Sequence, residues 1–217
     1  HVLDTIPRPA NYKFMYNLVE LLDTIRSQPL HVDMTPIQHL FGSVRGQNFH
    51  RTLQEVKHVC NYKPWGTITG RLATSPNSFP ILTMNKEFRA CVKPHNDWLL
   101  ELDFNAAELR VLLALSGAEQ PKNDIHDWNV KNVFDSKMTR ERAKEKTFAW
   151  LYSSKENKQL ERLYNKDLVR NKYWDGFKIQ TDYGRIIEDV DDHHALNYIV
   201  QSTTIDMVHE QAYKVYE

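Results

Sequence analysis

A short apolar run passes directly into a helical pattern near the middle of the chain, and this junction constrains the fold more than any other feature. Residues 98–102 (WLLEL) suit a short buried strand, whereas apolar residues over 109–116 recur at the three and four spacing of a helix. Asp103 lies where the expected strand ends and the helix begins. A carboxylate at the end of a rigid strand can place a divalent cation. The plainer interpretation of Asp103 is a helix cap.

The residues around Asp103 favour the metal interpretation. Asp103, Phe104, Glu108 and Arg110 follow the Asp-Tyr-Ser-x-x-Glu-x-Arg pattern of the first catalytic motif of family A DNA polymerases, with Asn105 in place of Ser. The chain resembles that family from about residue 64 to its C-terminal end. The resemblance implies that Asp103 binds two Mg²⁺ ions, with the carbonyl of Phe104 as a further ligand. It also implies that Glu108 and Phe104 form a wall against a ribose 2′-hydroxyl.

A second block, residues 139–153, carries two cations and two aromatic rings. Arg140, Lys144, Phe148 and Tyr152 recur every fourth residue, which on a helix places them along one stripe. An ordinary amphipathic helix is the alternative. The stripe resembles the fingers helix of family A polymerases. The resemblance implies that Arg140 and Lys144 meet the triphosphate of the incoming nucleotide and that Phe148 and Tyr152 shape the pocket for its base.

Two shorter blocks lie before this stripe. Residues 69–72 (TGRL) resemble a family block whose arginine, here Arg71, reaches primer–template DNA, and a guanidinium suits that contact because it is always charged. Residues 124–126 (DIH) resemble the family's Asp-Ile-His, which implies that His126 contacts the nucleotide phosphates. Taken alone, each is an ordinary surface turn or cap.

The last block, residues 193–217, has a helical core pattern with polar amides beside it. Asn197 and Gln201 resemble family residues that contact the end of the primer–template. His193 stands where the family often has Arg, so its charge would depend on pH. A packed helix with solvent-facing amides is the alternative.

Composition sets broader limits. The chain has 217 residues, of which 41% are hydrophobic, and its formal net charge is zero, so any contact with DNA must come from local clustering of charge. Two cysteines suit a reducing compartment. No apolar run approaches the length of a membrane span. These features predict a cytoplasmic protein, and the resemblance implies a bacterium or phage-infected host, with an organelle left open. The first residue, His1, indicates a processed or excised piece.

The expected fold is α+β and helix-rich, a partial right-hand polymerase consisting of palm and fingers. Helices are predicted over 14–25, from Thr35 to near Gly42, over 49–59 and over 193–217. The expected segments are a helical thumb-side or approach segment (1–60), palm with the first catalytic motif (61–134), fingers (135–190) and a palm helix that contacts primer–template DNA (191–217).

The expected function is template-directed DNA polymerisation from deoxynucleoside triphosphates. The family's His-Asp-Glu turn, which supplies a second metal-binding aspartate, is missing: residues 208–210 (VHE) fall within the last predicted helix. Because one carboxylate cannot hold two closely spaced cations, a second polypeptide or C-terminal segment is expected to complete the enzyme and to cover apolar surface near the C-terminus. The alternatives are a noncatalytic DNA-binding or assembly subunit and, more remotely, a nuclease that uses Asp103 with Glu101 or Glu108.

Overall fold

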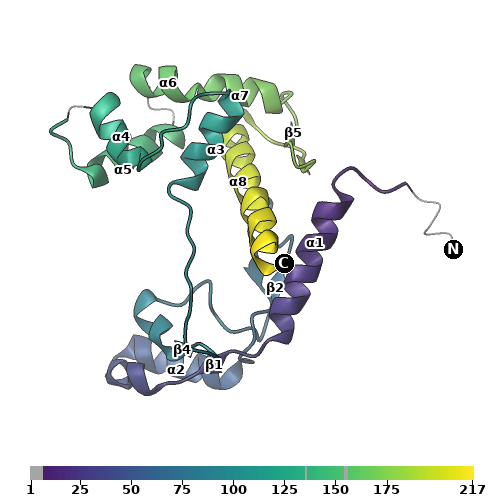
Figure 1. Cartoon of the computed structure of the whole chain (residues 1–217), viewed down its shortest axis with the longest axis vertical. Helices are drawn as coiled ribbons and strands as arrows, with labels where there is room; N and C mark the ends of the chain where they lie inside the picture. Colours follow the sequence, from purple (N-terminus) through teal and green to yellow (C-terminus); the bar gives the residue numbers. More distant parts are fainter. Residues whose placement is uncertain (1–6, 135, 154–155) are drawn as a thin grey trace. The chain divides into compact units, whose positions relative to one another are not determined.

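The computed structural model describes residues 7–134, 136–153 and 156–217, so the first six residues of the expected thumb-side segment and three positions of the expected fingers lie outside it. The described chain is helix-rich, with small antiparallel sheets, which confirms the α+β class (Figure 1). It divides into two compact units. One contains the chain up to Leu102 together with His209–Glu217, and the other contains Asp103–Val208.

The first unit begins with helix α1 (Tyr12–Ser27), as the periodicity predicts. Its other elements are β1 (His31–Val32), the 3₁₀ helix η2 (Thr35–Gly42), α2 (Val44–Glu55), β2 (Tyr62–Lys63), β3 (Ala73–Thr74), η3 (Lys86–Cys91) and β4 (Val92–Lys93). β1 pairs with β4 and β2 with β3, both antiparallel. The helix predicted over 49–59 is present but ends at Glu55, so Val56 and Val59 lie beyond it.

Two local contacts shape this unit. Phe49 of α2 stacks on Phe88 of η3, with ring centroids 4.3 Å apart, inside a small apolar core. Gly46 lets α2 approach η2, because a Cβ at that position would lie 2.0 Å from the carbonyl oxygen of Leu40. Only a residue without a side chain fits there.

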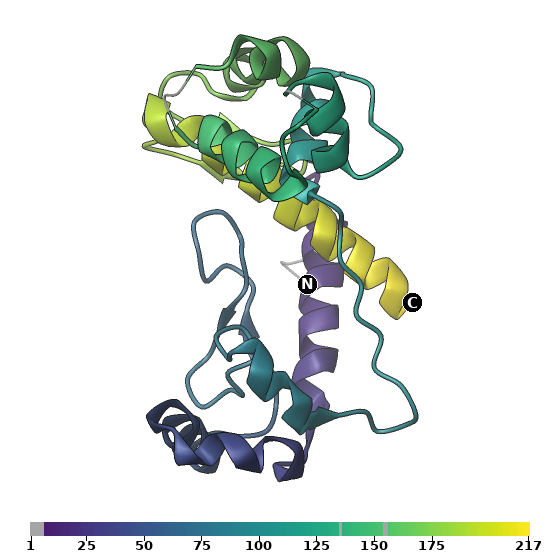
Figure 2. The same ribbon diagram turned by 90° about the vertical axis from the view of Figure 1, so that its left-hand side faces the viewer.

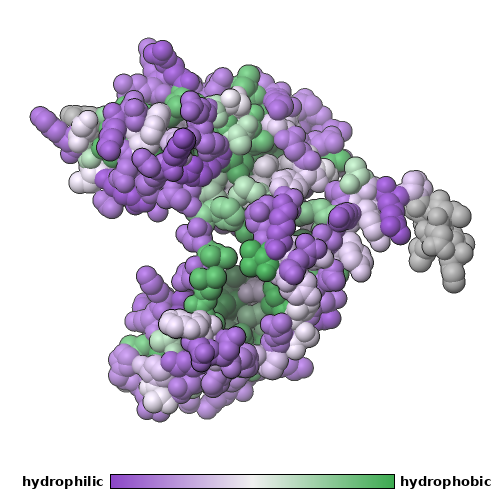
Figure 3. Space-filling model, in the orientation of Figure 1, coloured by the Kyte–Doolittle hydropathy of each residue, from purple (hydrophilic) through white to green (hydrophobic). Residues whose placement is uncertain are grey.

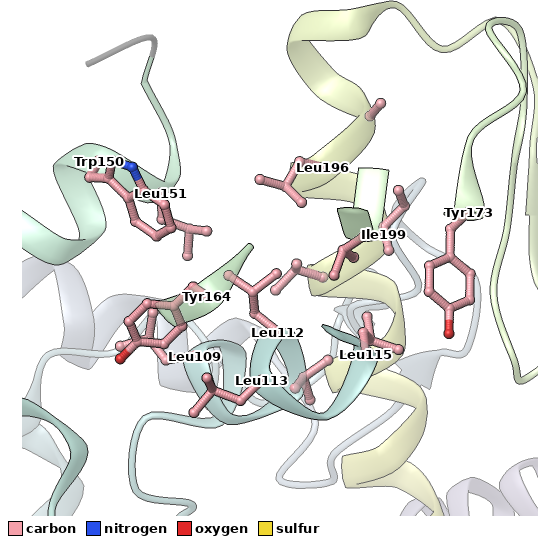
Figure 4. Packing of buried hydrophobic residues seen from close by; sticks show 14 of the residues in the cluster. Leu109, Leu112, Leu113, Leu115, Trp150, Leu151, Tyr164, Tyr173, Leu196 and Ile199 are labelled. Carbon is pink, nitrogen blue, oxygen red and sulfur yellow. The ribbon is translucent and has the colours of Figure 1, made fainter. Parts of the chain in front are cut away.

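The second unit is built from helices around one apolar core. Its elements are α3 (Ala107–Ser116), α4 (Ile125–Asn132), α5 (Arg140–Leu151), α6 (Lys158–Tyr164), α7 (Lys166–Tyr173), β5 (Ile179–Gln180), β6 (Ile186–Ile187) and most of α8 (Asp192–Tyr216). Leu109, Leu112 and Leu113 of α3 are fully buried, and Tyr164 of α6 and Ile199 of α8 belong to the same cluster (Figure 4). A tight turn at Gly184, with φ of 76°, joins β5 to β6.

The strand predicted over residues 98–102 is wrong. This segment follows β4 as an extended stretch without secondary structure, drawn as plain coil in both ribbon views (Figures 1 and 2). Trp98 and Leu100 are 84% and 81% exposed. A strand needs a neighbouring strand to pair its backbone groups, and among the described residues no strand is hydrogen-bonded to this segment. Asp103 therefore does not follow a buried strand.

No helix of the described residues is both long enough and apolar enough to cross a membrane.

Candidate nucleotide site

The candidate site lies in the unit Asp103–Val208, on the exposed side of α5. Thr139 caps this helix by accepting a hydrogen bond from the backbone N–H of Arg142 at 3.3 Å. Ala143, Thr147 and Trp150 face the core. The predicted stripe Arg140, Lys144, Phe148 and Tyr152 is partly or fully exposed. The helix therefore buries one side, and the two cations and two rings lie on a second side that is at least partly exposed.

The ends of α3 and α5 meet at a polar contact. The hydroxyl of Tyr152 donates a hydrogen bond to Oε2 of Glu108, which lies in the first turn of α3. The ring of Tyr152 stacks near that of Phe148, with centroids 6.1 Å apart and planes 21° apart. Two predicted nucleotide-binding residues separated by 44 positions therefore touch directly.

His126, in the first turn of α4, completes the aromatic side of this group. Its side chain is buried, 3% exposed, and its ring centroid lies 5.9 Å from that of Phe148. Burial lowers the pKa of His126, opposed by the nearby carboxylate of Asp124. The neutral form is therefore favoured at pH 7. Nδ1 of His126 is buried without a hydrogen-bond partner in the described part of the chain.

Asp124, which starts α4, binds the first cation of the stripe. It accepts hydrogen bonds from Nε and Nη2 of Arg140 at 3.2 and 2.7 Å. Its Oδ1 also accepts from the backbone N–H groups of His126 and Asp127, the usual geometry of an N-cap. The Arg140 guanidinium, with these other donors, holds the pKa of Asp124 well below the usual range of a carboxyl group. Helices α4 and α5 lie side by side around this ion pair (Figure 1).

The face of the second unit seen in Figure 3 is mostly hydrophilic, with purple atoms over the region of α4 and α5. A hydrophilic surface that carries cations suits a charged ligand more than an apolar one.

Asp103 and Phe104 lie just before α3 and are both exposed. Ala106, which follows them, adopts a left-handed conformation with φ of 50°, which costs an L-residue about 1 kcal/mol. Among the described residues no three His, Cys, Asp or Glu side chains gather closely enough to hold a metal ion. One exposed carboxylate and one carbonyl are too few ligands for two Mg²⁺ ions. The described residues therefore do not form the predicted two-metal site by themselves.

A cavity of about 350 Å³ lies between the C-terminal end of α5, helix α7 and the start of α8. It is lined by Leu151, Tyr152, Ser153, Lys166, Asp167, Arg170, Asp192, His193, His194, Leu196 and Asn197. The structure thus brings Asn197, a predicted DNA contact, to the same cavity as Tyr152. Gln201 lies about one turn further along α8 and is half-buried.

Sequence reasoning missed two cations of this cavity. Lys166 lies 4.8 Å from the ring of Trp150, and Arg170 forms ion pairs with Asp167 at 3.0 Å and Asp192 at 3.2 Å. In the sequence, Lys166 and Arg170 are marked only by their separation of four residues on one short helix. Such a separation is common on solvated helical faces and does not by itself indicate a cavity.

Arg71 belongs to the other compact unit, where it is exposed just before β3. The site is therefore described without it.

A scan against protein-family models and a search of curated proteins both found no match for this chain.

Proposed function

We propose that this chain is the palm and fingers part of a family A-like DNA polymerase, which adds deoxynucleotides to a primer end under the direction of a template. The proposal is supported chiefly by one observation: Arg140, Phe148 and Tyr152 share one helical stripe with direct contacts to Asp124, His126 and Glu108. An ordinary amphipathic helix carries polar or charged residues on its solvent face, but it does not need a buried histidine and a carboxylate gathered around the same stripe.

Each group has a part in binding a nucleoside triphosphate. Arg140 and Lys144 bind the phosphates as permanent cations. His126, neutral in the free protein, donates one N–H to a phosphate oxygen and gains affinity for a proton when the anion binds. Phe148 and Tyr152 offer ring faces to the base, and Glu108, held by Tyr152, meets the sugar with Phe104. Such a site works by positioning the triphosphate for in-line attack by the primer hydroxyl, with pyrophosphate as the leaving group.

The expected Mg²⁺ ions require carboxylates beyond Asp103. We assign these to a second polypeptide or to a C-terminal segment that carries a His-Asp-Glu turn. Primer–template DNA, with contacts at Arg71, Asn197 and Gln201, and a deoxynucleoside triphosphate are the remaining partners. Asp103→Asn should abolish nucleotide addition in the competent assembly while DNA affinity stays nearly unchanged, because the substitution removes a metal ligand and no phosphate contact.

A binding experiment tests the nucleotide site directly. The dissociation constant of a fluorescent deoxynucleoside triphosphate is measured with the wild type and with Arg140→Ala and Lys144→Ala. Each substitution removes a charge-assisted contact worth about 1.5–3 kcal/mol, which corresponds to roughly 10- to 150-fold weaker binding. Arg142→Ala and Lys146→Ala are matched controls, since these cations lie off the stripe on the same helix. Equal weakening by all four substitutions would contradict the proposed site.

A noncatalytic DNA-binding or assembly subunit is the second candidate, because the residues that the structure describes contain no cluster of three His, Cys, Asp or Glu side chains that could hold a metal ion. Primer extension separates the two: the chain is assayed alone and then with a polypeptide carrying the His-Asp-Glu turn. Extension only in the mixture supports the polymerase and the need for a partner. Strong extension by the pure chain would refute the need for a partner, and triphosphate binding without extension in either case would favour the subunit.

A further inference from the structure

A chain of polar contacts connects the loop before α3 to the first residue of α5. Nδ2 of Asn105 donates a hydrogen bond to Oδ2 of Asp124 at 2.6 Å, and the same oxygen accepts from Nη2 of Arg140 at 2.7 Å. Asn105 directly follows Asp103 and Phe104. It also stands at the position where the resemblance to family A polymerases places Ser, whose shorter side chain has no amide N–H group to donate.

The other side of Asn105 is held by Arg110, one turn into α3. Nε of Arg110 donates to the backbone oxygen of Asn105 at 3.0 Å, while Nη1 and Nη2 bind the carbonyl oxygens of Pro121 and Asn123 at 2.8 and 2.9 Å. Arg110 therefore fixes both the backbone at Asn105 and the loop that leads to Asp124. The amide of Asn105 joins two segments that are already restrained.

Capping alone does not account for these contacts. As the N-cap of α4, Asp124 needs only the backbone N–H groups of the first turn, and it has two of them through Oδ1. The additional donors are the Asn105 amide and the fork of Arg140. That fork uses Nε and Nη2, so Nη1 is the guanidinium nitrogen that the carboxylate does not engage.

We infer that Asn105 and Asp124 are positioning residues that orient Arg140 for the phosphates of the nucleotide. This inference rests on the proposed function. A free arginine side chain loses considerable rotamer entropy when it binds a ligand, and a preformed contact removes part of that cost in advance. Because Asn105 lies two residues after Asp103, the contact also ties the orientation of the phosphate cation to the loop that carries the metal-binding carboxylate.

A different role for Asp124 predicts the opposite result. If Asp124 acts as a counter-ion that competes with the triphosphate, loosening its contacts should strengthen triphosphate binding. If it orients Arg140, loosening them should weaken binding. The sign of the change therefore distinguishes the two roles.

The test is a double-mutant cycle on triphosphate affinity with the whole chain. Asn105→Leu keeps the size of the side chain and removes its hydrogen bonds, and we expect about fivefold weaker binding of the fluorescent deoxynucleoside triphosphate, the effect of one ordinary hydrogen bond. In an Arg140→Ala background the same substitution should change affinity less than about 1.5-fold, because its effect passes through Arg140. Asn132→Leu is the control, since Asn132 donates a hydrogen bond to the Trp128 carbonyl at the far end of α4, away from Asp124.

Equal effects of Asn105→Leu in both backgrounds, or tighter binding, would overturn the inference. A second measurement does not depend on nucleotide binding: the Nε–H signal of Arg140 is followed by NMR. In the wild type its exchange with solvent should be slowed, and Asn105→Leu should speed it several-fold while Asn132→Leu does not. Absence of triphosphate binding by the wild type would count against the proposed function, whereas unchanged Arg140 exchange in Asn105→Leu would count against the positioning role itself.

Discussion

Loss of the ion pair between Arg185 and Asp206 is expected to destabilise the second unit strongly. Nε and Nη2 of Arg185, beside the β5–β6 turn, bind both carboxylate oxygens of Asp206 in α8 at 3.0 and 2.5 Å. The side chains are 13% and 1% exposed. Removing one partner of a buried pair leaves an uncompensated charge and costs about 3–5 kcal/mol. Since water reaches the edge of Arg185, Arg185→Met should cost about 3 kcal/mol, roughly a 150-fold change in the ratio of folded to unfolded protein.

Urea unfolding followed by tryptophan fluorescence measures this loss. Replacing Trp65 and Trp98 by Phe restricts the signal to tryptophans of the unit Asp103–Val208. With a urea dependence of about 2 kcal/mol per molar, Arg185→Met should lower the midpoint by about 1.5 M.

Two further variants test the reasoning. Arg142→Met breaks an exposed pair with Glu145, whose side chains are 64% and 66% exposed, and should change stability by less than about 0.5 kcal/mol. Arg185→Met combined with Asp206→Leu should recover much of the loss, because no charge is then left buried. If Arg185→Met were no more destabilising than Arg142→Met, the argument from burial would be refuted.

Four other outcomes are expected. Phe148→Tyr should raise dideoxynucleotide incorporation by the competent assembly, since Phe has no hydroxyl to replace a missing sugar 3′-hydroxyl; equal chain termination would count against its assignment. Glu108→Ala should admit ribonucleotides more readily, which the ratio of ribo- to deoxynucleotide incorporation measures. Gly46→Ala should destabilise the first unit by about 2 kcal/mol in thermal unfolding, because the backbone of Leu40 cannot yield to the new Cβ. Asp124→Asn should make the free energy of unfolding fall less steeply in acid. The pKa of Asp124 is lowered in the folded protein. The carboxylate therefore contributes its full stabilisation above the unfolded pKa of about 3.9, and this stabilisation is lost as pH falls through the folded pKa. An acid titration of the free energy of unfolding with the same slope in both proteins would contradict this.

The sequence by itself determined several of the helices through their local spacing. The spacing of Arg140, Lys144, Phe148 and Tyr152 predicted that the four side chains share one stripe of a helix, and the structure places them on α5 and at its C-terminal cap. The last helix was equally predictable from its core pattern, and residues 208–210 indeed lie inside it. Helical periodicity is a local property, because each turn forms its hydrogen bonds within four residues.

Only the tertiary structure decided which side chains meet. The contact of Tyr152 with Glu108, the fork of Arg140 on Asp124 and the cavity cations Lys166 and Arg170 depend on how α3, α4, α5 and α7 pack, and no local spacing encodes this. The error over residues 98–102 has the same cause. An apolar run indicates that its side chains favour burial. A strand, however, forms only where another segment supplies the matching hydrogen bonds.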